Sequence, residues 1–335
     1  MEELTGKKVL LLAPSFFGYE IEIEKELQNL GAKVYHYNER SKNDFFTKVF
    51  LRLNLKSIIQ KKINTYYHDI TEQTKDLEID FLLLINPETV DNKKIYNIKK
   101  YHPNIKVYTY MWDSIKNKKE SLTLLEKSDK FFTFDVEDKK INQKIDFLPL
   151  FYINDYKSID MQSDYTYDFT FIGTIHSDRY KIVKKIEKFS KENDLTIFFY
   201  FYSPSRILFF FQKLFKKDFK HIDKNDISYN SMNKDEIVNI IKKSKIVIDM
   251  HHPLQNGLTM RTLEILGAKR KLLTTNEDIE NYDFFHKNNI ALFDRDKVNI
   301  NIDFIKSKLY KIDDNIYQKY SINSWLKTIF KEETK

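Results

Sequence analysis

The residues with the clearest chemical potential lie in segment 251–267, which follows an apolar strand and opens a helix. Gly257 would let the backbone approach a ligand closely, and Thr259 can cap the helix, whose free N–H groups and positive dipole end favour a phosphate. Arg261 and Glu264 stand three residues apart and therefore share one helix face. Together they could clamp a nucleoside diphosphate. The Arg261 cation would bind the phosphates of the ligand, and the Glu264 carboxylate would bind its ribose hydroxyls. An (i, i+3) salt bridge on a surface helix is the plainer alternative.

The rest of the chain shows two series of alternating strands and helices. Continuous apolar runs such as 81–85 are typical of parallel strands that are buried on both faces. The pattern predicts an α/β chain of two doubly wound parallel-sheet domains, at 1–155 and 156–315, with a closing helix at 316–335. The strands are expected at 9–13, 33–37, 81–85, 107–110 and 130–134 in the first series, and at 167–172, 196–202, 227–229, 245–249 and 272–275 in the second.

Composition excludes several classes of protein. The 335 residues favour two domains, and 41% hydrophobic with 15% aromatic residues exclude disorder. The absence of Cys excludes disulfides, thiolate nucleophiles and Cys-ligated metal clusters. Residues 1–8 lack the order of a signal peptide, and no stretch approaches the ~18 apolar residues of a membrane span, so we expect a soluble, cytoplasmic protein. The net charge of +7 suits an anionic membrane, nucleic acid or phosphorylated substrates equally.

Unusual residues also stand directly after other predicted strands. Ligands of open parallel sheets bind beyond the carboxyl ends of the strands, so these loops are candidate binding loops. They are 14–19, 86–88, 111–114 and 173–179.

On these residues the chain resembles the GT-B glycosyltransferases, in particular the bacterial CgeB-like and capsule or lipopolysaccharide biosynthesis group. The resemblance implies two Rossmann-like domains that face across a cleft, with the acceptor bound mainly by the first and a nucleotide-sugar donor mainly by the second. It covers most of the chain, at 111–114, at 131–138 with 147–150, at 171–174 with Asp178 and Arg179, and at 257–273.

The resemblance also implies the donor site. Glu264 would hold the ribose, while Arg261 and the backbone of Gly257, Leu258 and Thr259 would hold the diphosphate. Further residues expected at the donor nucleotide are Gly173 and Thr174, under the phosphates, together with Arg179 and Asn256. UDP is the default nucleotide, and GDP, dTDP or a CMP-activated acidic sugar stay open.

One departure from the family pattern bears on the mechanism. Retaining GT-B enzymes often carry a second glutamate eight residues before the ribose glutamate, and this chain has Asn256 there. A retaining mechanism of that type is therefore in question, and an inverting enzyme would need a general base within reach of the acceptor hydroxyl.

Three side chains at strand ends are candidates for that base. We favour Asp113, because Trp112 beside it could form an apolar wall for a sugar; Glu88 and, from the second domain, His251 are the others. The alternative for Asp113 is that it caps the following helix together with Ser114. The acceptor or sugar site is expected to include Phe17, Gly18, Tyr19 and Trp112.

No metal or other cofactor is expected. There is no Asp-x-Asp in a suitable loop, and adjacent ligands such as His251 and His252 point opposite ways at a strand end. The resemblance implies that Arg, Lys and a helix dipole replace the charge of a metal.

Two basic segments rich in aromatic residues remain, at 45–62 and 206–217. Lys48, Arg52 and Lys56 recur every fourth residue of the first segment and form a basic stripe beside apolar positions. Such segments suit the surface of an anionic membrane, where a lipid-linked acceptor would lie, and 45–62 is the favoured contact with the inner membrane. The alternative for each is a core helix with a solvated lysine face.

The sequence therefore predicts a glycosyltransferase that moves a sugar, from UDP by default, to a cell-surface polysaccharide, capsule or lipopolysaccharide acceptor. Two alternatives stay open. One is a non-catalytic basic module that binds nucleic acid through 45–62 and 206–221, although no nucleic-acid partner is expected. The other is a degenerate GT-B protein that binds nucleotide sugars without transferring them.

Overall fold

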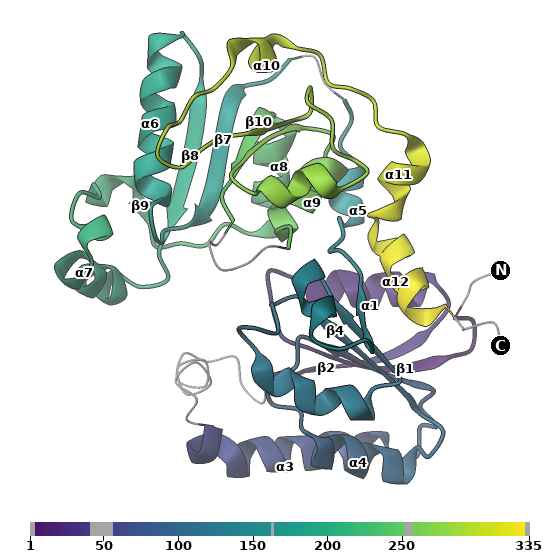
Figure 1. Cartoon of the computed structure of the whole chain (residues 1–335). Helices are drawn as coiled ribbons and strands as arrows, with labels where there is room; N and C mark the ends of the chain where they lie inside the picture. Colours follow the sequence, from purple (N-terminus) through teal and green to yellow (C-terminus); the bar gives the residue numbers. More distant parts are fainter. Residues whose placement is uncertain (1–3, 41–55, 162–163, 252–256, 332–335) are drawn as a thin grey trace. The chain divides into compact units, whose positions relative to one another are not determined.

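The computed structural model describes residues 4–40, 56–161, 164–251 and 257–331 (Figure 1). Its contacts divide the chain into two compact units. The first unit holds Met1–Leu150, Gln255–Gly257 and Ile322–Lys335, and the second holds Phe151–Leu254 and Leu258–Ser321. Among the described residues, every helix is too short or too polar to span a bilayer.

The first unit is built on a parallel sheet of six strands in the order β2-β1-β3-β4-β5-β6. The predicted strands of the first half are all present, and the sequence pattern missed only the short β6. The strands are β1 (Lys8–Ala13), β2 (Lys33–Asn38), β3 (Phe81–Ile85), β4 (Lys106–Met111), β5 (Lys130–Thr133) and β6 (Ile145–Phe147). The α-helices described between them are α1 (Tyr19–Asn29), α3 (Lys56–Thr74) and α4 (Asn92–Tyr101), with the 3-10 helices η1 (Lys119–Lys127) and η2 (Val136–Lys140).

Local chemistry explains where these elements lie. All five residues of β3 are buried, as expected of a central strand with helices on both faces. Gly18, at φ 82°, precedes α1 in the left-handed region that glycine adopts at little cost. The side chain of Asp91 accepts the backbone N–H of Lys94 and so caps α4.

The second unit contains another parallel sheet of six strands, in the order β12-β11-β10-β7-β8-β9. Its strands are β7 (Tyr167–Thr174), β8 (Ile197–Tyr202), β9 (Ile227–Ser228), β10 (Ser244–Asp249), β11 (Lys271–Thr274) and β12 (Ile290–Leu292). Its α-helices are α5 (Asn154–Lys157), α6 (Arg179–Glu192), α7 (Arg206–Phe215), α8 (Lys234–Lys242), α9 (Met260–Gly267), α10 (Ile302–Lys306) and α11 (Asp314–Lys319); the 3-10 helices are η3 (Lys217–Phe219), η4 (Lys224–Asp226) and η5 (Glu277–Asn281). Of these strands, the three-residue β12 was not predicted.

Both strand orders contain a point at which the direction of winding reverses. In the first sheet it lies between β1 and β3, and in the second between β7 and β10. Ligands of open α/β sheets bind beyond the carboxyl ends of the strands at such switch points. The topology therefore directs attention to the loops after β1, β3, β7 and β10.

The chain ends in two helices rather than in the single helix predicted at 316–335. Helix α11 belongs to the second unit, whereas α12 (Ile322–Phe330) belongs to the first. Trp325 of α12 is 1% exposed, and its ring lies 4.7 Å from that of Tyr110 in an edge-to-face arrangement. Phe330 contacts Phe81 in the same way, with ring centroids 5.1 Å apart. The C-terminal helix thus completes the core of the N-terminal unit.

We expect Trp325→Ala to destabilise the first unit by about 3–5 kcal/mol, because it leaves a large cavity beside Tyr110. Chemical denaturation followed by circular dichroism measures this loss. Trp112→Ala is the matched control, since Trp112 is only partly buried. Equal losses in the two variants would contradict the packing of α12 described above.

Candidate functional site

Three arginine side chains come together at the switch point of the second sheet. Arg179 opens α6 directly after the β7 loop, Arg261 lies in the first turn of α9, and Arg295 follows β12. The charges of Arg295 and Arg261 both act on the guanidinium of Arg179. We refer to Arg179, Arg261 and Arg295 as the arginine cluster.

Arg179 is the most deeply held member of the cluster. Its guanidinium donates to the carbonyl oxygen of Met250 at 2.8 Å and to that of Thr174 at 3.3 Å, so it links the ends of β7 and β10. Burial lowers the pKa of Arg179; Arg295 and Arg261 act in the same direction, and Asp249 and Asp178 oppose them. The guanidinium is therefore fixed where added negative charge would stabilise it.

Gly173 makes room for this arrangement. A Cβ at Gly173 would lie 2.9 Å from Cζ of Phe171 and 3.4 Å from Nη1 of Arg179. A glycine was expected at position 173, beneath the phosphates of a donor. The packing of Phe171 and Arg179 around its backbone explains this glycine. Thr174 ends β7 beside it.

Arg295 is the member that the sequence analysis missed. It forms an ion pair with Asp178 at 2.7 Å, and it donates to the carbonyl oxygen of His251 and to the hydroxyl of Thr275, the latter at 3.4 Å. The sequence feature that marks Arg295 is its position between two aspartates, Asp294 and Asp296. It was missed because it follows β12, a strand of three residues that is too short for the pattern to predict.

The N-terminus of α9 is fixed by side-chain bonds. The Thr259 hydroxyl accepts the backbone N–H of Thr262, which confirms the expected cap. Asp249, at the end of β10, accepts the hydroxyls of Thr259 at 2.5 Å and Thr262 at 3.1 Å. Asp249, which the sequence analysis did not single out, thereby ties the start of α9 to the sheet.

Arg261 and Glu264 form the ion pair that was the plainer alternative, at 2.6 Å. The pair is not on the surface, since the Glu264 side chain is 9% and the Arg261 side chain 18% exposed. Tyr156 from α5 lies against both, and burial, followed by the Glu264 carboxylate, raises the pKa of Tyr156 well above its ordinary range. The two charged groups therefore occupy one preorganised, partly dry position.

The other predicted donor residues have different surroundings. Gly257 belongs to the first unit, where a Cβ would lie 2.6 Å from Cε2 of Phe134, so the close approach it permits is to this ring. The side chain of Leu258 is buried. His251 was a candidate for the general base rather than a donor residue, and its ring Nδ1 lies 2.9 Å from the Thr275 hydroxyl. Asn256 lies outside the described residues.

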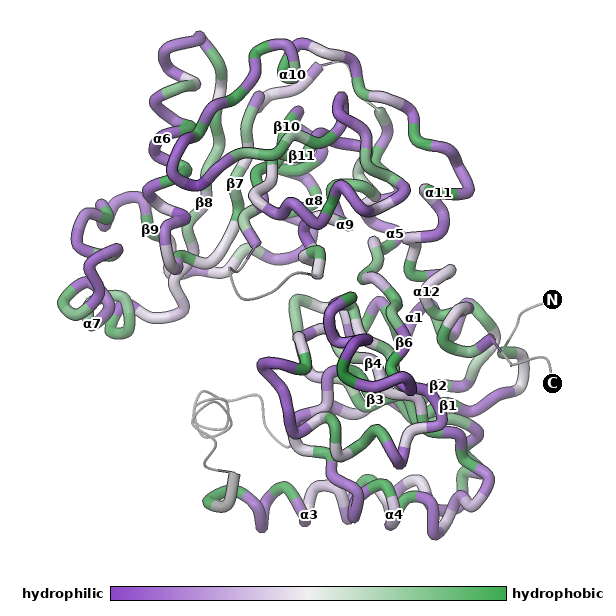
Figure 2. The backbone as a smooth tube through the Cα atoms, in the orientation of Figure 1, coloured by the Kyte–Doolittle hydropathy of each residue, from purple (hydrophilic) through white to green (hydrophobic). Residues whose placement is uncertain are grey.

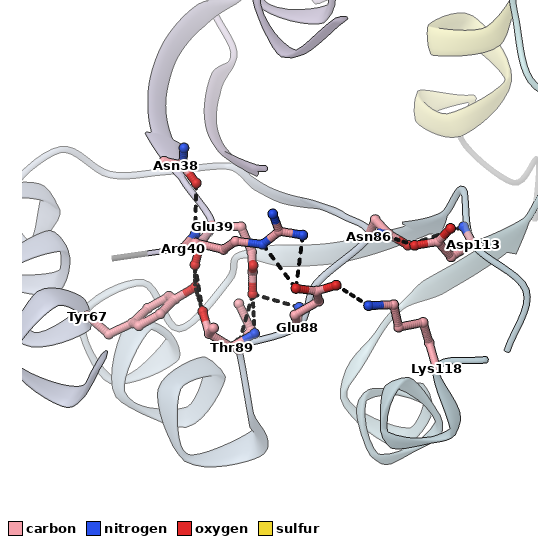
Figure 3. A network of polar contacts seen from close by, with 10 residues as sticks. Asn38, Glu39, Arg40, Tyr67, Asn86, Glu88, Thr89, Asp113 and Lys118 are labelled. Atoms are coloured by element: carbon pink, nitrogen blue, oxygen red, sulfur yellow. Dashed lines mark hydrogen bonds and ion pairs between the residues drawn. The ribbon is translucent and has the colours of Figure 1, made fainter. Parts of the chain in front are cut away.

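In the first unit, Asp113 lies beside the switch point, at the end of β4. Its carboxylate accepts an N–H of the Asn86 side-chain amide at 3.0 Å, and its own backbone N–H donates to the side-chain oxygen Oδ1 of Asn86 at 3.2 Å (Figure 3). Asn86 has φ 44°, an uncommon conformation for a residue other than glycine. The Ser114 hydroxyl donates to Asp138 at 3.3 Å and also accepts the backbone N–H of Lys116 at 3.3 Å, so Ser114, and not Asp113, caps the turn that follows. Asp113 is thus oriented by Asn86, after β3.

Aromatic side chains adjoin Asp113. The rings of Phe16 and Trp112 lie 5.5 Å apart, and Phe17 packs edge-to-face on Phe16 at 4.8 Å. Phe17 is 61% exposed and has φ 52°, whereas Tyr19 is buried at the start of α1. We refer to Phe16, Phe17 and Trp112 as the aromatic shelf. Of the predicted acceptor residues, Phe17 and Trp112 therefore present ring surface, and Gly18 provides the turn.

Glu88 is neutralised by two cations. Arg40 holds its carboxylate through Nε at 3.0 Å and Nη2 at 2.9 Å, and Lys118 contacts the other oxygen (Figure 3). Burial alone would raise the pKa of Glu88, but Arg40 and Lys118 outweigh it and lower the pKa. A carboxylate in this setting is a weak base, so the contacts do not favour Glu88 as the proton acceptor.

A second, fully buried carboxylate lies behind it. Glu39 accepts the backbone N–H groups of Glu88 at 2.7 Å and Val90 at 3.1 Å, and that of Thr89 (Figure 3). Burial raises the pKa of Glu39 above its ordinary value, although these donors oppose the shift. Glu39 shapes the loop after β3, and sequence patterning gave no signal for it.

Among the described residues, no three His, Asp or Glu side chains gather as they would to hold a metal ion. The positive charge described at the second switch point comes from the arginine cluster and the start of α9.

Comparison with known proteins identifies the fold. No family model matches the chain. No curated protein matches it either. Among solved structures, a glycosyltransferase from Rickettsia africae is similar over 98% of this chain and 99% of its own, with a TM-score of 0.54 and 17% identity. Anabaena HepE in complex with UDP-glucose is similar over 85% of both chains, with a TM-score of 0.53 and 9% identity.

A third structure belongs to another class of enzyme. A Listeria monocytogenes protein named as a UDP-N-acetylglucosamine 2-epimerase is similar over 97% of both chains, with a TM-score of 0.50 and 11% identity. Together with the two parallel six-stranded sheets, these likenesses confirm the predicted α/β GT-B fold. The comparisons do not identify the CgeB-like group.

Glu39 and Glu88 are predicted to change the pH dependence of the free energy of unfolding in opposite directions. A raised pKa means that Glu39 contributes stability at low pH and loses it as the pH rises through its folded-state pKa. A lowered pKa means that Glu88 contributes stability above its ordinary pKa and loses it as the pH falls. As the pH rises, the free energy of unfolding of Glu39→Gln relative to wild type should therefore improve above about 4.5, whereas that of Glu88→Gln should worsen below about 4.5 and stay constant above it.

Urea denaturation across acid to neutral pH measures both differences, and each variant is the control for the other. Parallel pH profiles for the two variants would contradict the assigned environments.

Proposed function

We propose that this protein is a glycosyltransferase that uses a nucleotide-sugar donor. The observation that carries the proposal is the arginine cluster, placed with the start of α9 at the switch point of a GT-B sheet. Guanidinium groups bind phosphate oxygens through paired, charge-assisted hydrogen bonds, and a helix N-terminus adds further N–H donors. This site suits a diphosphate and supplies positive charge without a metal ion.

The donor is proposed to be a UDP-sugar. HepE, which shares the fold, was solved with UDP-glucose, and UDP is therefore the first nucleotide to test. The diphosphate would lie against Arg179, Arg261 and Arg295. Glu264 would accept the ribose hydroxyls from its position beside Tyr156.

In the proposed reaction, Asp113 acts as the general base. It takes the proton of the acceptor hydroxyl, the acceptor oxygen bonds to the anomeric carbon, and the bond from that carbon to the diphosphate oxygen breaks. Asn86 orients the Asp113 carboxylate, and the aromatic shelf offers the apolar face on which sugar rings stack. The arginine cluster stabilises the negative charge that develops on the departing diphosphate. This single displacement inverts the anomeric centre.

The acceptor is proposed to be a growing cell-surface glycan, such as capsule or lipopolysaccharide, elongated on the cytoplasmic side. This part of the proposal rests on the family resemblance of the sequence. The predicted membrane contact through 45–62 concerns residues that lie mostly outside the described ranges and stays a prediction.

Donor binding is tested by calorimetry with UDP, GDP, dTDP, CMP and ADP. We expect selective binding of one nucleotide diphosphate, weakened roughly tenfold or more in Arg261→Gln and in Arg295→Gln because each loses a charged hydrogen-bond donor to phosphate. Arg40→Gln removes the same charge from the first unit and should bind as wild type does. Wild-type binding in both cluster variants would contradict the donor site, and salt-sensitive RNA binding without nucleotide binding would favour the nucleic-acid alternative.

Catalysis is tested through UDP released from UDP-glucose, with water as the acceptor. Asp113→Asn should keep donor affinity and reduce turnover by about 10²–10⁴-fold, because it removes the base and keeps the shape. Glu88→Gln should cost far less, since Glu88 is already neutralised. Binding without any turnover would indicate a protein that only binds nucleotide sugars, and conversion of a UDP-sugar to its epimer would indicate an epimerase.

A further inference from the structure

Helix α7 has an unusual distribution of apolar side chains. Seven of its ten residues are Ile, Leu or Phe, and among them only Phe209 is buried. Phe209 packs against Phe219 and Tyr229, with ring centroids 6.2 and 6.3 Å apart. Figure 2, which colours the backbone by hydropathy, shows hydrophobic residues gathered in α7. A single aromatic anchor therefore holds a strongly apolar helix to the second unit.

The polar side chains of α7 lie on the side that faces the protein. Arg206 and Lys213 stand three residues before and four after Phe209, so they share its face. The Arg206 guanidinium lies 5.2 Å from the ring centroid of Tyr229, and Nζ of Lys213 donates to the carbonyl oxygen of Ile222 at 2.6 Å. An ordinary surface helix directs its apolar side chains toward the protein and its polar side chains toward solvent, whereas α7 does the reverse. The arrangement therefore contradicts the core helix considered for 206–217.

The opposite face of α7 is exposed and apolar. Ile207, Phe211 and Leu214 follow one another at helical spacings of four and three, and they are 70%, 51% and 53% exposed. Phe215 is 80% exposed and stacks on Phe211, with ring centroids 6.4 Å apart. Contiguous apolar side chains of this kind mark an interaction surface.

Positive charge adjoins this face. Lys216, Lys217 and Lys220 follow α7 directly and are exposed, with Asp218 as the one acidic residue among them. We define the α7 patch as residues 206–220. It combines outward Phe, Leu and Ile side chains with a basic cluster at its C-terminal end.

We propose that the α7 patch docks on the surface of an anionic lipid bilayer. The outward apolar side chains would enter the boundary between head groups and acyl chains, and the three lysines would contact anionic head groups. Apolar insertion alone or positive charge alone does not suffice for stable anchoring, but the two together bind an anionic surface well. This inference goes beyond the proposed function, because it assigns a membrane contact to the second unit and needs no sugar donor.

Charge favours a bilayer over a second copy of the chain. A two-fold pairing with parallel α7 helices would bring Lys216, Lys217 and Lys220 of both copies together, where like charges repel. An antiparallel pairing would place these lysines beside a helix that has no acidic residue. An anionic bilayer makes the same charges favourable. A stable protein interface also needs about 800 Å² from each partner, which is much for a ten-residue helix.

The test is cosedimentation of the full chain with vesicles of phosphatidylcholine and phosphatidylglycerol in equal parts. We expect wild type to bind these vesicles, to bind pure phosphatidylcholine at least roughly tenfold more weakly, and to dissociate in high salt. Phe211→Ser with Phe215→Ser should reduce binding by roughly tenfold or more, and so should a triple Gln substitution of Lys216, Lys217 and Lys220.

The controls match each change elsewhere on the surface. Tyr96→Ser removes an aromatic ring that is 69% exposed, and Gln at Lys140, Lys188 and Lys191 removes three exposed charges. These variants should bind vesicles nearly as wild type does. The substituted patch residues are exposed, and Lys216 alone contacts a buried ring, with Nζ 5.7 Å from the centroid of Phe219. Circular dichroism and melting temperatures close to those of wild type are therefore expected throughout.

Two outcomes would overturn the proposal. One is undiminished vesicle binding by the Phe211→Ser, Phe215→Ser variant. The other is self-association of wild type without vesicles, abolished by the same two substitutions, which would assign the patch to a second copy. Nucleotides are absent from the assay, so its result is independent of whether the protein transfers sugars.

Discussion

Three like charges, the guanidinium groups of the arginine cluster, are confined at the carboxyl ends of β7 and β10. Guanidinium groups repel one another and lose solvation when buried, so each needs fixed acceptors. The Met250 carbonyl oxygen holds Arg179, Asp178 holds Arg295, and Glu264 holds Arg261. Phosphate groups supply the charge that such a cluster best accommodates, and the GT-B topology places the cluster where ligands of parallel sheets bind.

The first unit shows how environment assigns different roles to neighbouring carboxylates. Glu39 is buried and has a raised pKa, while Glu88 is held by Arg40 and Lys118 and has a lowered one. Both therefore serve the structure of the loop after β3. Asp113 instead has Asn86 as an amide partner and follows Trp112 of the aromatic shelf, and for these reasons it is the carboxylate proposed as the general base.

Much of this could be predicted from the sequence, where the signal was local. Buried runs such as β3 identified the central strands, and Thr259 identified the start of α9. Arg295 escaped, because β12 is too short for a pattern and its partner Asp178 is 117 residues away. For 206–217 the sequence left a membrane-surface segment and a core helix as alternatives, because hydrophobic periodicity gives the faces of a helix but not which of them meets the protein.

Calorimetry with uridine, UMP and UDP on the full chain measures directly whether the arginine cluster binds phosphate groups. If the arginine cluster binds the diphosphate, affinity should rise steeply with each phosphate, with UDP at least about a hundredfold tighter than uridine and sensitive to salt. Equal affinities for the three ligands, or no binding of UDP, would contradict the cluster as the donor-phosphate site.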